Sequence, residues 1–180
     1  MIKIKVKKSG KMKPLALLLA AAAVAVSFYS QQHQQTKADP NLYTVARVVD
    51  GDTLALSNGE KVRLIGVDTP ESSSNPKLYR DSNRTGQDTK TILALGARAK
   101  AFTKTLCEGK SVRLVTDVQP RDKYGRLLAY VYLDDKTFVN AELIKSGYAR
   151  VYTIPPNVKY KDLFLDLQRE ARAKQRGLWG

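Results

Sequence analysis

Residues 43–67 read YTVARVVDGDTLALSNGEKVRLIGV, and two turn signals divide them into three apolar segments. The first signal is Asp50-Gly51-Asp52 and the second is Asn58-Gly59. Asp or Asn followed by Gly between apolar runs is a strong short-range signal for a β-hairpin, because these residues tolerate the left-handed backbone of a tight turn. The sequence therefore predicts a meander of three strands, at 43–49, 53–56 and 61–67.

One helix and two strands are expected after the meander. Apolar residues recur at helical spacing over 95–106, and Gly109 offers a left-handed stop. Strand-like runs follow at 111–118 and 127–133. Five short strands with a helix between the third and the fourth have the connectivity of a small closed barrel of the oligonucleotide-binding (OB) class. The sequence thus predicts an α+β fold, a five-stranded OB-fold β-barrel with about three helices.

The other two helices are expected near the C-terminus. The first begins at Asn140 as its N-cap and ends at Gly147. The second covers 160–176, and the glycine after it lets Trp179 fold back against that helix.

Residues 1–29 have the three parts of an export signal, namely a lysine-rich start, an apolar run and then small residues. The apolar run is shorter than the ~20 residues that span a bilayer comfortably. A cleaved signal peptide is therefore favoured over an uncleaved membrane anchor formed by 14–29. Residues 30–41 are glutamine-rich and are expected to be a flexible spacer. The sequence predicts an exported monomer, secreted or periplasmic, whose catalytic domain is 42–180.

Composition narrows the chemistry of this domain. The formal net charge is +14, and six of these charges are lysines of residues 1–13, so +8 remains on the rest of the chain. That excess favours a polyanionic partner. The only histidine, His33, lies in the spacer, and the only cysteine is Cys107. These two facts exclude a zinc site, an intramolecular disulfide and histidine-based catalysis from the domain.

Carboxylates gather around the turns of the meander. Asp52 ends the first turn, and Asp68 and Glu71 follow the third segment. Asp52 alone, or Asp68 and Glu71 alone, would be explained by the residue preferences of turns. Because the hairpin brings Asp52 toward Asp68, two carboxylates and a backbone carbonyl are expected to face one point. Hard oxygen ligands with positions left open for water and substrate are typical of a calcium site.

Two arginines accompany these acids. Arg63 lies five residues before Asp68, and a flat strand would place them on opposite faces, so a bulge or sharp twist is expected near Gly66. Arg126 follows Gly125 at the start of a strand. A planar guanidinium suits bidentate contact with a phosphate. These residue types together predict metal-assisted hydrolysis of a phosphodiester.

Three motifs, in this order, resemble those of the staphylococcal (micrococcal) nuclease, or thermonuclease, family. They are D-G-D-T at 50–53, D-T-P-E at 68–71 after Arg63, and D-K-Y-G-R at 122–126, within a likeness that extends over 43–179. The resemblance implies a calcium-dependent nuclease on a five-stranded barrel. Such an enzyme hydrolyses phosphodiester bonds of DNA and RNA and leaves 3′-phosphate ends.

The resemblance also implies roles for the matching acids. Calcium would be held by the carboxylates of Asp52 and Asp68 and by the backbone carbonyl of Thr69. Glu71 would orient or deprotonate the attacking water.

The same resemblance places Arg63 and Arg126 on the scissile phosphate. Positive groups aimed at charge that grows during the reaction raise its rate. Lys123 and Tyr124 are expected to bind substrate, Tyr124 by stacking on a base, with Tyr152 as a weaker candidate.

Residues 72–88 are polar and are expected to form a surface loop, longer than in the type member of the family. Lys77, Arg80 and Arg84 are expected to keep this loop soluble, with contact to substrate as the alternative.

Two other functions stay open. A barrel of the same family that has lost catalysis would only bind nucleic acid, but it would have no reason to keep the metal acids and Glu71 together. The third possible function is hydrolysis of some other phosphodiester. The basic charge of the chain argues against it, because such charge favours a long polyanionic substrate.

Overall fold

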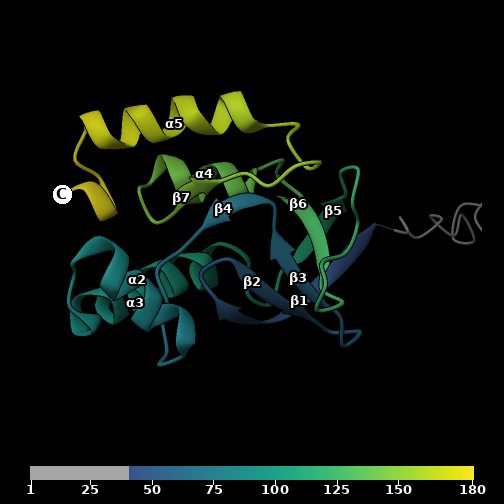
Figure 1. Ribbon diagram of the computed structural model, residues 1–180. Coiled ribbons are helices and arrows are strands. Elements are labelled where there is room, and N and C mark those ends of the chain that lie inside the picture. Colours follow the sequence, from purple (N-terminus) through teal and green to yellow (C-terminus); the bar gives the residue numbers. More distant parts are fainter. Residues whose placement is uncertain (1–40) are drawn as a thin grey trace, which may run out of the picture. The chain divides into compact units, whose positions relative to one another are not determined.

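Five strands close into a barrel in the computed structural model, which describes residues 41–180 (Figure 1). Around the barrel the strands follow the order β1 (Leu42–Asp50), β2 (Thr53–Leu56), β3 (Lys61–Leu64), β6 (Leu127–Leu133) and β5 (Ser111–Val115). Neighbouring strands are antiparallel except β3 and β6, which are parallel. This order is that of an OB-fold, so the α+β class and the barrel are confirmed. The expected signal or anchor at 1–29, and all but the last residue of the spacer, lie outside the described residues.

The strand expected over 61–67 is in fact two strands. After β3 the chain turns at Gly66, whose φ is +78°, into β4 (Gly66–Asp68), which pairs with β7 (Arg150–Tyr152) outside the barrel. A side chain could not be accommodated there, because a Cβ on Gly66 would lie 2.5 Å from the ring of Phe164. The sharp twist expected near Gly66 is therefore present.

The prediction of a loop over 72–88 is wrong, because helix α2 (Pro76–Thr85) occupies most of that segment. The side-chain oxygen of Asn75 accepts hydrogen bonds from the backbone N–H groups of Lys77 and Leu78 and caps the helix. Gly86 ends α2 with φ +70°. Leu78 is the only buried residue of α2, so this helix lacks the repeated apolar residues that predicted the helix over 95–106.

Three more α-helices follow in the described part of the chain, which makes four instead of about three. They are α3 (Thr89–Cys107), α4 (Val139–Lys145) and α5 (Lys161–Ala173), with a short 3₁₀ helix, η1 (Gly177–Trp179), at the end. Trp179 does fold back, and its ring lies 4.2 Å from the guanidinium of Arg172 on α5. None of the helices formed by residues 41–180 has the length and apolar character needed to cross a bilayer.

The prediction of Asn140 as an N-cap is wrong, because this residue lies inside α4 and is completely buried. Its side chain accepts a hydrogen bond from the backbone N–H of Val131 and donates one to the carbonyl of Ile65, both at 2.9 Å. Asn140 thus ties α4 to the end of the barrel from which the chain passes into β4.

One apolar core joins the barrel interior to the helices, with Tyr130 and Phe164 as its largest completely buried side chains. Cys107 belongs to this core, and burial raises the pKa of its thiol to about 12. The cysteine is therefore a packing residue.

Candidate active site

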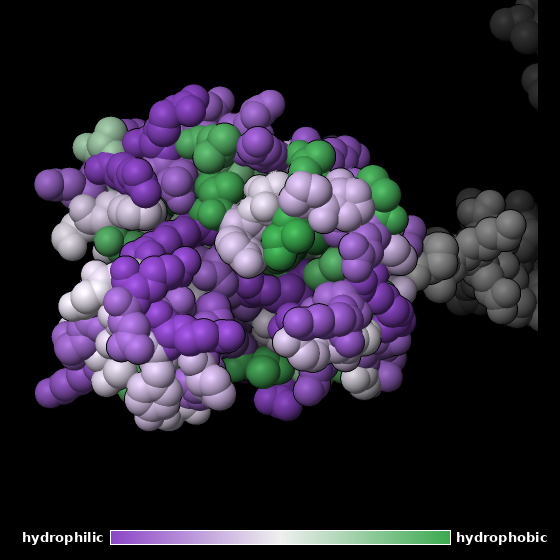
Figure 2. All heavy atoms as spheres, in the orientation of Figure 1, coloured by the Kyte–Doolittle hydropathy of each residue, from purple (hydrophilic) through white to green (hydrophobic). Residues whose placement is uncertain are grey.

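A cavity of about 760 Å³ is lined by residues from β3, β4, α2, the turn at 119–126 and the segment 152–157. Figure 2 shows hydrophilic side chains gathered around a hollow beside α2. The charged residues that line the cavity are six cations and three acids: Arg63, Lys77, Arg80, Arg84, Lys123, Arg126, Asp68, Asp81 and Asp122. The excess of positive charge suits an anionic ligand.

Arg63 lies between two of the expected metal ligands. Its guanidinium forms an ion pair with Asp52 and a second with Asp68, with 3.0 Å between Nη2 and Oδ1. Burial lowers the pKa of Arg63, while the charge of Asp68 acts in the opposite direction. Because a guanidinium remains protonated in proteins, the two acids converge on one positive group.

Asp52 joins the first hairpin turn to the motif at 68–71. Only 6% of it is exposed, and its Oδ2 accepts hydrogen bonds from the backbone N–H of Thr69 at 3.0 Å and from Thr69 Oγ1 at 3.1 Å. The approach requires glycine before Asp52, because a Cβ on Gly51 would lie 2.7 Å from Thr69 Oγ1. The first hairpin turn therefore contacts the motif at 68–71, as the sequence predicts.

Lys77, for which the sequence left contact with substrate as the alternative, binds the same motif from α2. Its Nζ lies 3.1 Å from Asp68 Oδ1 and 3.4 Å from the backbone oxygen of Thr69. The same atom lies 2.5 Å from Glu71 Oε1. Burial disfavours the charge of this ammonium, but Asp68 and Glu71 outweigh it and raise the pKa of Lys77. One cation therefore touches three oxygens of the 68–71 motif.

Glu71 is held in place by both α2 and α3. The carboxylate is 8% exposed, and the side-chain amide of Asn75 donates a hydrogen bond to its Oε2. On the other side, a Cβ on Gly96 of α3 would lie 2.1 Å from the carbonyl oxygen of Glu71, so only glycine fits. Asn75 thus caps α2 and orients the acid.

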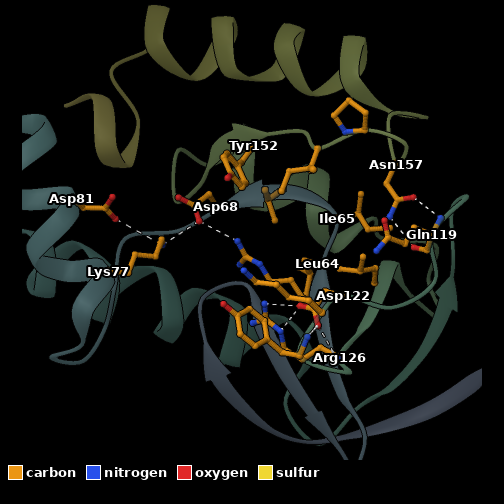
Figure 3. Close-up of a pocket in the computed structure, with 18 of the residues that line it drawn as sticks. Leu64, Ile65, Asp68, Lys77, Asp81, Gln119, Asp122, Arg126, Tyr152 and Asn157 are labelled. Carbon is orange, nitrogen blue, oxygen red and sulfur yellow. Dashed lines mark hydrogen bonds and ion pairs between the residues drawn. The ribbon is translucent and has the colours of Figure 1, made fainter.

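The motif at 122–126 forms one tight turn around Asp122. Its Oδ1 accepts hydrogen bonds from the backbone N–H groups of Tyr124 and Arg126, and its Oδ2 accepts one from Arg126 Nε at 2.7 Å. Burial opposes ionisation of Asp122, but these bonds prevail and lower its pKa. Asp122 therefore fixes the direction in which the guanidinium of Arg126 enters the cavity (Figure 3).

The ring of Tyr124 is 73% exposed beside this turn. The guanidinium carbon of Arg126 lies 5.5 Å, and Lys123 Nζ 5.1 Å, from its centroid. Tyr152, the weaker stacking candidate, lines the same cavity from β7.

The residues expected to hold a metal fit a hard cation in chemistry. Among residues 41–180, no three acidic, histidine or cysteine side chains form a metal cluster of their own. The expected set instead combines two carboxylates with the Thr69 carbonyl, and Asp68 and that carbonyl already contact the Lys77 ammonium. Oxygen ligands of this kind suit Ca²⁺. In the structure, Arg63 and Lys77 neutralise the oxygens that such an ion would use.

The structure links Asp52, Arg63, Asp68, Thr69 and Glu71 through direct contacts or through Lys77. The other predicted residues, Lys123, Tyr124 and Arg126, line the same cavity as Arg63 and Asp68 without contacting that group. Sequence reasoning gave no role in the site to Asn75, Asp81 and Asp122. The cap formed by Asn75 and Pro76 was the one local signal that could have found the first two.

Comparisons with known proteins agree with the motifs. The model of a family described as "Staphylococcal nuclease homologue" matches residues 61–180. A thermonuclease of Staphylococcus intermedius is 43% identical over 140 residues, which cover 76% of this chain and 75% of that protein. A thermonuclease of Staphylococcus hyicus is 35% identical over 147 residues, covering 80% and 79% respectively. Endonuclease YncB of Bacillus subtilis is 38% identical over 141 residues, covering 76% and 60%.

Proposed function

Since the chain belongs to the staphylococcal nuclease family, we propose that it is a calcium-dependent nuclease that hydrolyses phosphodiester bonds of DNA and RNA. The observation that carries this proposal is the convergence of Asp52 and Asp68 on Arg63. A domain that only bound nucleic acid would have no use for Asp52 and the half-buried Asp68 beside a third acid, Glu71.

Asp52, Asp68 and the carbonyl of Thr69 would hold the calcium ion. When bound, the ion polarises the phosphate and makes a bound water easier to deprotonate. Arg63 and Lys77, which now neutralise these carboxylates, would be released from them in the calcium-bound state. Both side chains then regain hydrogen-bond donors that can turn to a phosphate.

Glu71 would orient the attacking water or take its proton. Its Oε2 is fixed by Asn75, and its Oε1 is bound by Lys77, so the acid becomes a proton acceptor once Lys77 releases it. Arg63 and Arg126 would hold the scissile phosphate from two sides. Guanidinium groups placed before the reaction stabilise the negative charge that develops in the transition state.

The neighbourhood of Tyr124 favours a nucleic acid over a small phosphodiester. An exposed ring next to Lys123 and Arg126 offers a base a stacking surface and offers its backbone positive charge. Stacking of this kind tolerates every base and either sugar, which agrees with action on both DNA and RNA. Export through residues 1–29 and the monomeric state stay predictions from the sequence.

The test is incubation of the purified chain with single-stranded DNA and with RNA, in calcium and in excess chelator. We expect both polymers to be cleaved in calcium and neither in chelator. Cleavage that continues in chelator would remove the metal from the mechanism. Binding of the polymers without cleavage under any divalent ion would favour the non-catalytic binding domain.

A further inference from the structure

Helix α2 presents one charged face to the cavity. Lys77, Arg80, Asp81 and Arg84 are spaced i, i+3, i+4 and i+7, positions that share one side of a helix. All four line the cavity. The helix is anchored by Leu78, which is only 1% exposed. The packing of Leu78 thus sets the orientation of α2, and the charged side of the helix faces the cavity.

Two guanidinium groups on this face have hydrogen-bond donors to spare. Lys77 is committed to Asp68 and Glu71. Arg84 pairs with Asp81 at 2.9 Å between Nη2 and Oδ1, yet 65% of its side chain is exposed. Arg80 is exposed and forms no ion pair with any residue of the described range 41–180. Their donors are therefore available to an anion that enters the cavity.

The basic residues of α2 lie across the cavity from Arg126, the residue proposed to hold the scissile phosphate. Figure 3 shows Lys77 and Asp81 on one side of Asp68 and Arg126 on the other. Arg126, Arg80 and Arg84 line the same cavity, so a nucleic-acid strand held at its scissile phosphate by Arg126 can present its next phosphate to α2. A guanidinium suits that phosphate, because its planar fork binds two oxygens at once.

We propose that Arg80 and Arg84 bind the phosphate next to the scissile one, which makes α2 a second phosphate-binding wall of the cavity. The inference rests on the proposed nuclease function, and it names the polynucleotide backbone as the ligand of α2. Asp81 positions Arg84 through their ion pair. The consequence is a preference for chains over substrates that contain a single phosphodiester.

Salt dependence of binding tests this assignment without cleavage. Affinity for a fluorescein-labelled single-stranded 20-mer would be measured by fluorescence anisotropy at several salt concentrations, in calcium and in a Glu71→Gln background. We expect Arg80→Ala with Arg84→Ala to weaken binding about tenfold. The slope of log K against log[salt] is negative, and loss of one phosphate contact makes it less steep by ~0.7. Alanine favours helix, so α2 is expected to stay folded.

The matched control is Lys90→Ala with Arg98→Ala. Both residues are exposed on α3, neither lines the cavity, and the change in net charge is the same. We expect this pair to leave the salt slope unchanged. An equal loss in the two double variants, or an unchanged slope in the α2 variant, would overturn the inference, because the effect would then be one of overall charge.

Steady-state kinetics give a second readout. With Glu71 restored, the α2 double variant should raise KM on the 20-mer about tenfold while kcat changes less than about twofold. The rise in KM should be several times smaller on a dinucleoside monophosphate, which has no neighbouring phosphate. An equal rise on both substrates would refute the phosphate-binding role of α2. If the wild-type chain fails to cleave in calcium, the proposed function falls, while the salt slope still decides the role of α2.

Discussion

The ammonium of Lys77 lies 2.5 Å from Oε1 of Glu71, the acid expected to activate water. The same ammonium contacts Asp68 and the Thr69 carbonyl, two of the expected calcium ligands. A cation carried by α2 therefore takes part of the place that a divalent ion would need. In the proposed mechanism, Lys77 leaves Glu71 before this acid accepts a proton from water.

Replacing Lys77 by methionine should tighten calcium binding. The substitution keeps a long apolar side chain but removes the charge that competes for Asp68, and we expect the calcium Kd to fall about tenfold. Isothermal titration calorimetry of the chain without nucleic acid measures this directly. Lys90→Met, an exposed change on α3, is the control and should leave Kd as it is. An unchanged or weaker affinity in Lys77→Met would show that the ammonium does not compete with the ion.

Glu71→Gln should separate binding from catalysis. The amide keeps the size of the side chain and can still bond to Asn75, but it cannot take a proton from water, so we expect kcat to fall roughly 10²- to 10⁴-fold. Affinity for single-stranded DNA should change little. Glu170→Gln, on α5 and away from the residues that line the cavity, should retain full activity. A Glu71→Gln variant with near-normal kcat would mean that another group handles the proton.

Most of the barrel could be predicted because its turns carry local signals. The Asp-Gly and Asn-Gly pairs mark the ends of β1, β2 and β3, and β6 has the bounds expected from its apolar run. By contrast, β4 and β7 are three residues each, too short to show a period. They exist because Gly66 turns the chain out of the barrel and pairs with Tyr152, which is distant in sequence.

The candidate site, too, could be predicted from the sequence only in part. The approach of Asp52 to Asp68 could be anticipated, because one hairpin brings both residues to the same end of the barrel. The contacts of Lys77 could not be anticipated, because they depend on α2. This helix buries a single residue, Leu78, and so has no repeated apolar residues in its sequence. The position of Arg126 depends on its bonds to Asp122, to which the sequence assigned no role of its own within the motif at 122–126.

Arg126→Lys should cripple turnover although it keeps the positive charge. A lysine cannot reproduce the bond from Nε to Asp122 together with a planar fork toward phosphate. We expect kcat to fall about 10²- to 10³-fold, the cost of losing one donor that stabilises transition-state charge. Initial rates on single-stranded DNA in saturating calcium measure the loss, with Arg98→Lys on α3 as the matched control. If the variant turns over normally, Arg126 does not hold the reacting phosphate.

Asp122→Asn should reveal a contribution to stability that depends on pH. The hydrogen bonds from Arg126 and the backbone lower the pKa of Asp122 in the folded state. The stabilisation is then fully present above the unfolded pKa of about 3.9 and is lost as pH falls through the folded value. Urea unfolding at pH 7, 5, 4 and 3 measures the difference in free energy of unfolding between wild type and variant. We expect that difference to be constant from pH 7 to 5 and to shrink below about pH 4.

Asp166→Asn, which removes an exposed carboxylate on α5, is the control for a general change in charge. A difference that stays constant down to pH 3 would mean that the bonds to Arg126 do not favour the ionised form of Asp122.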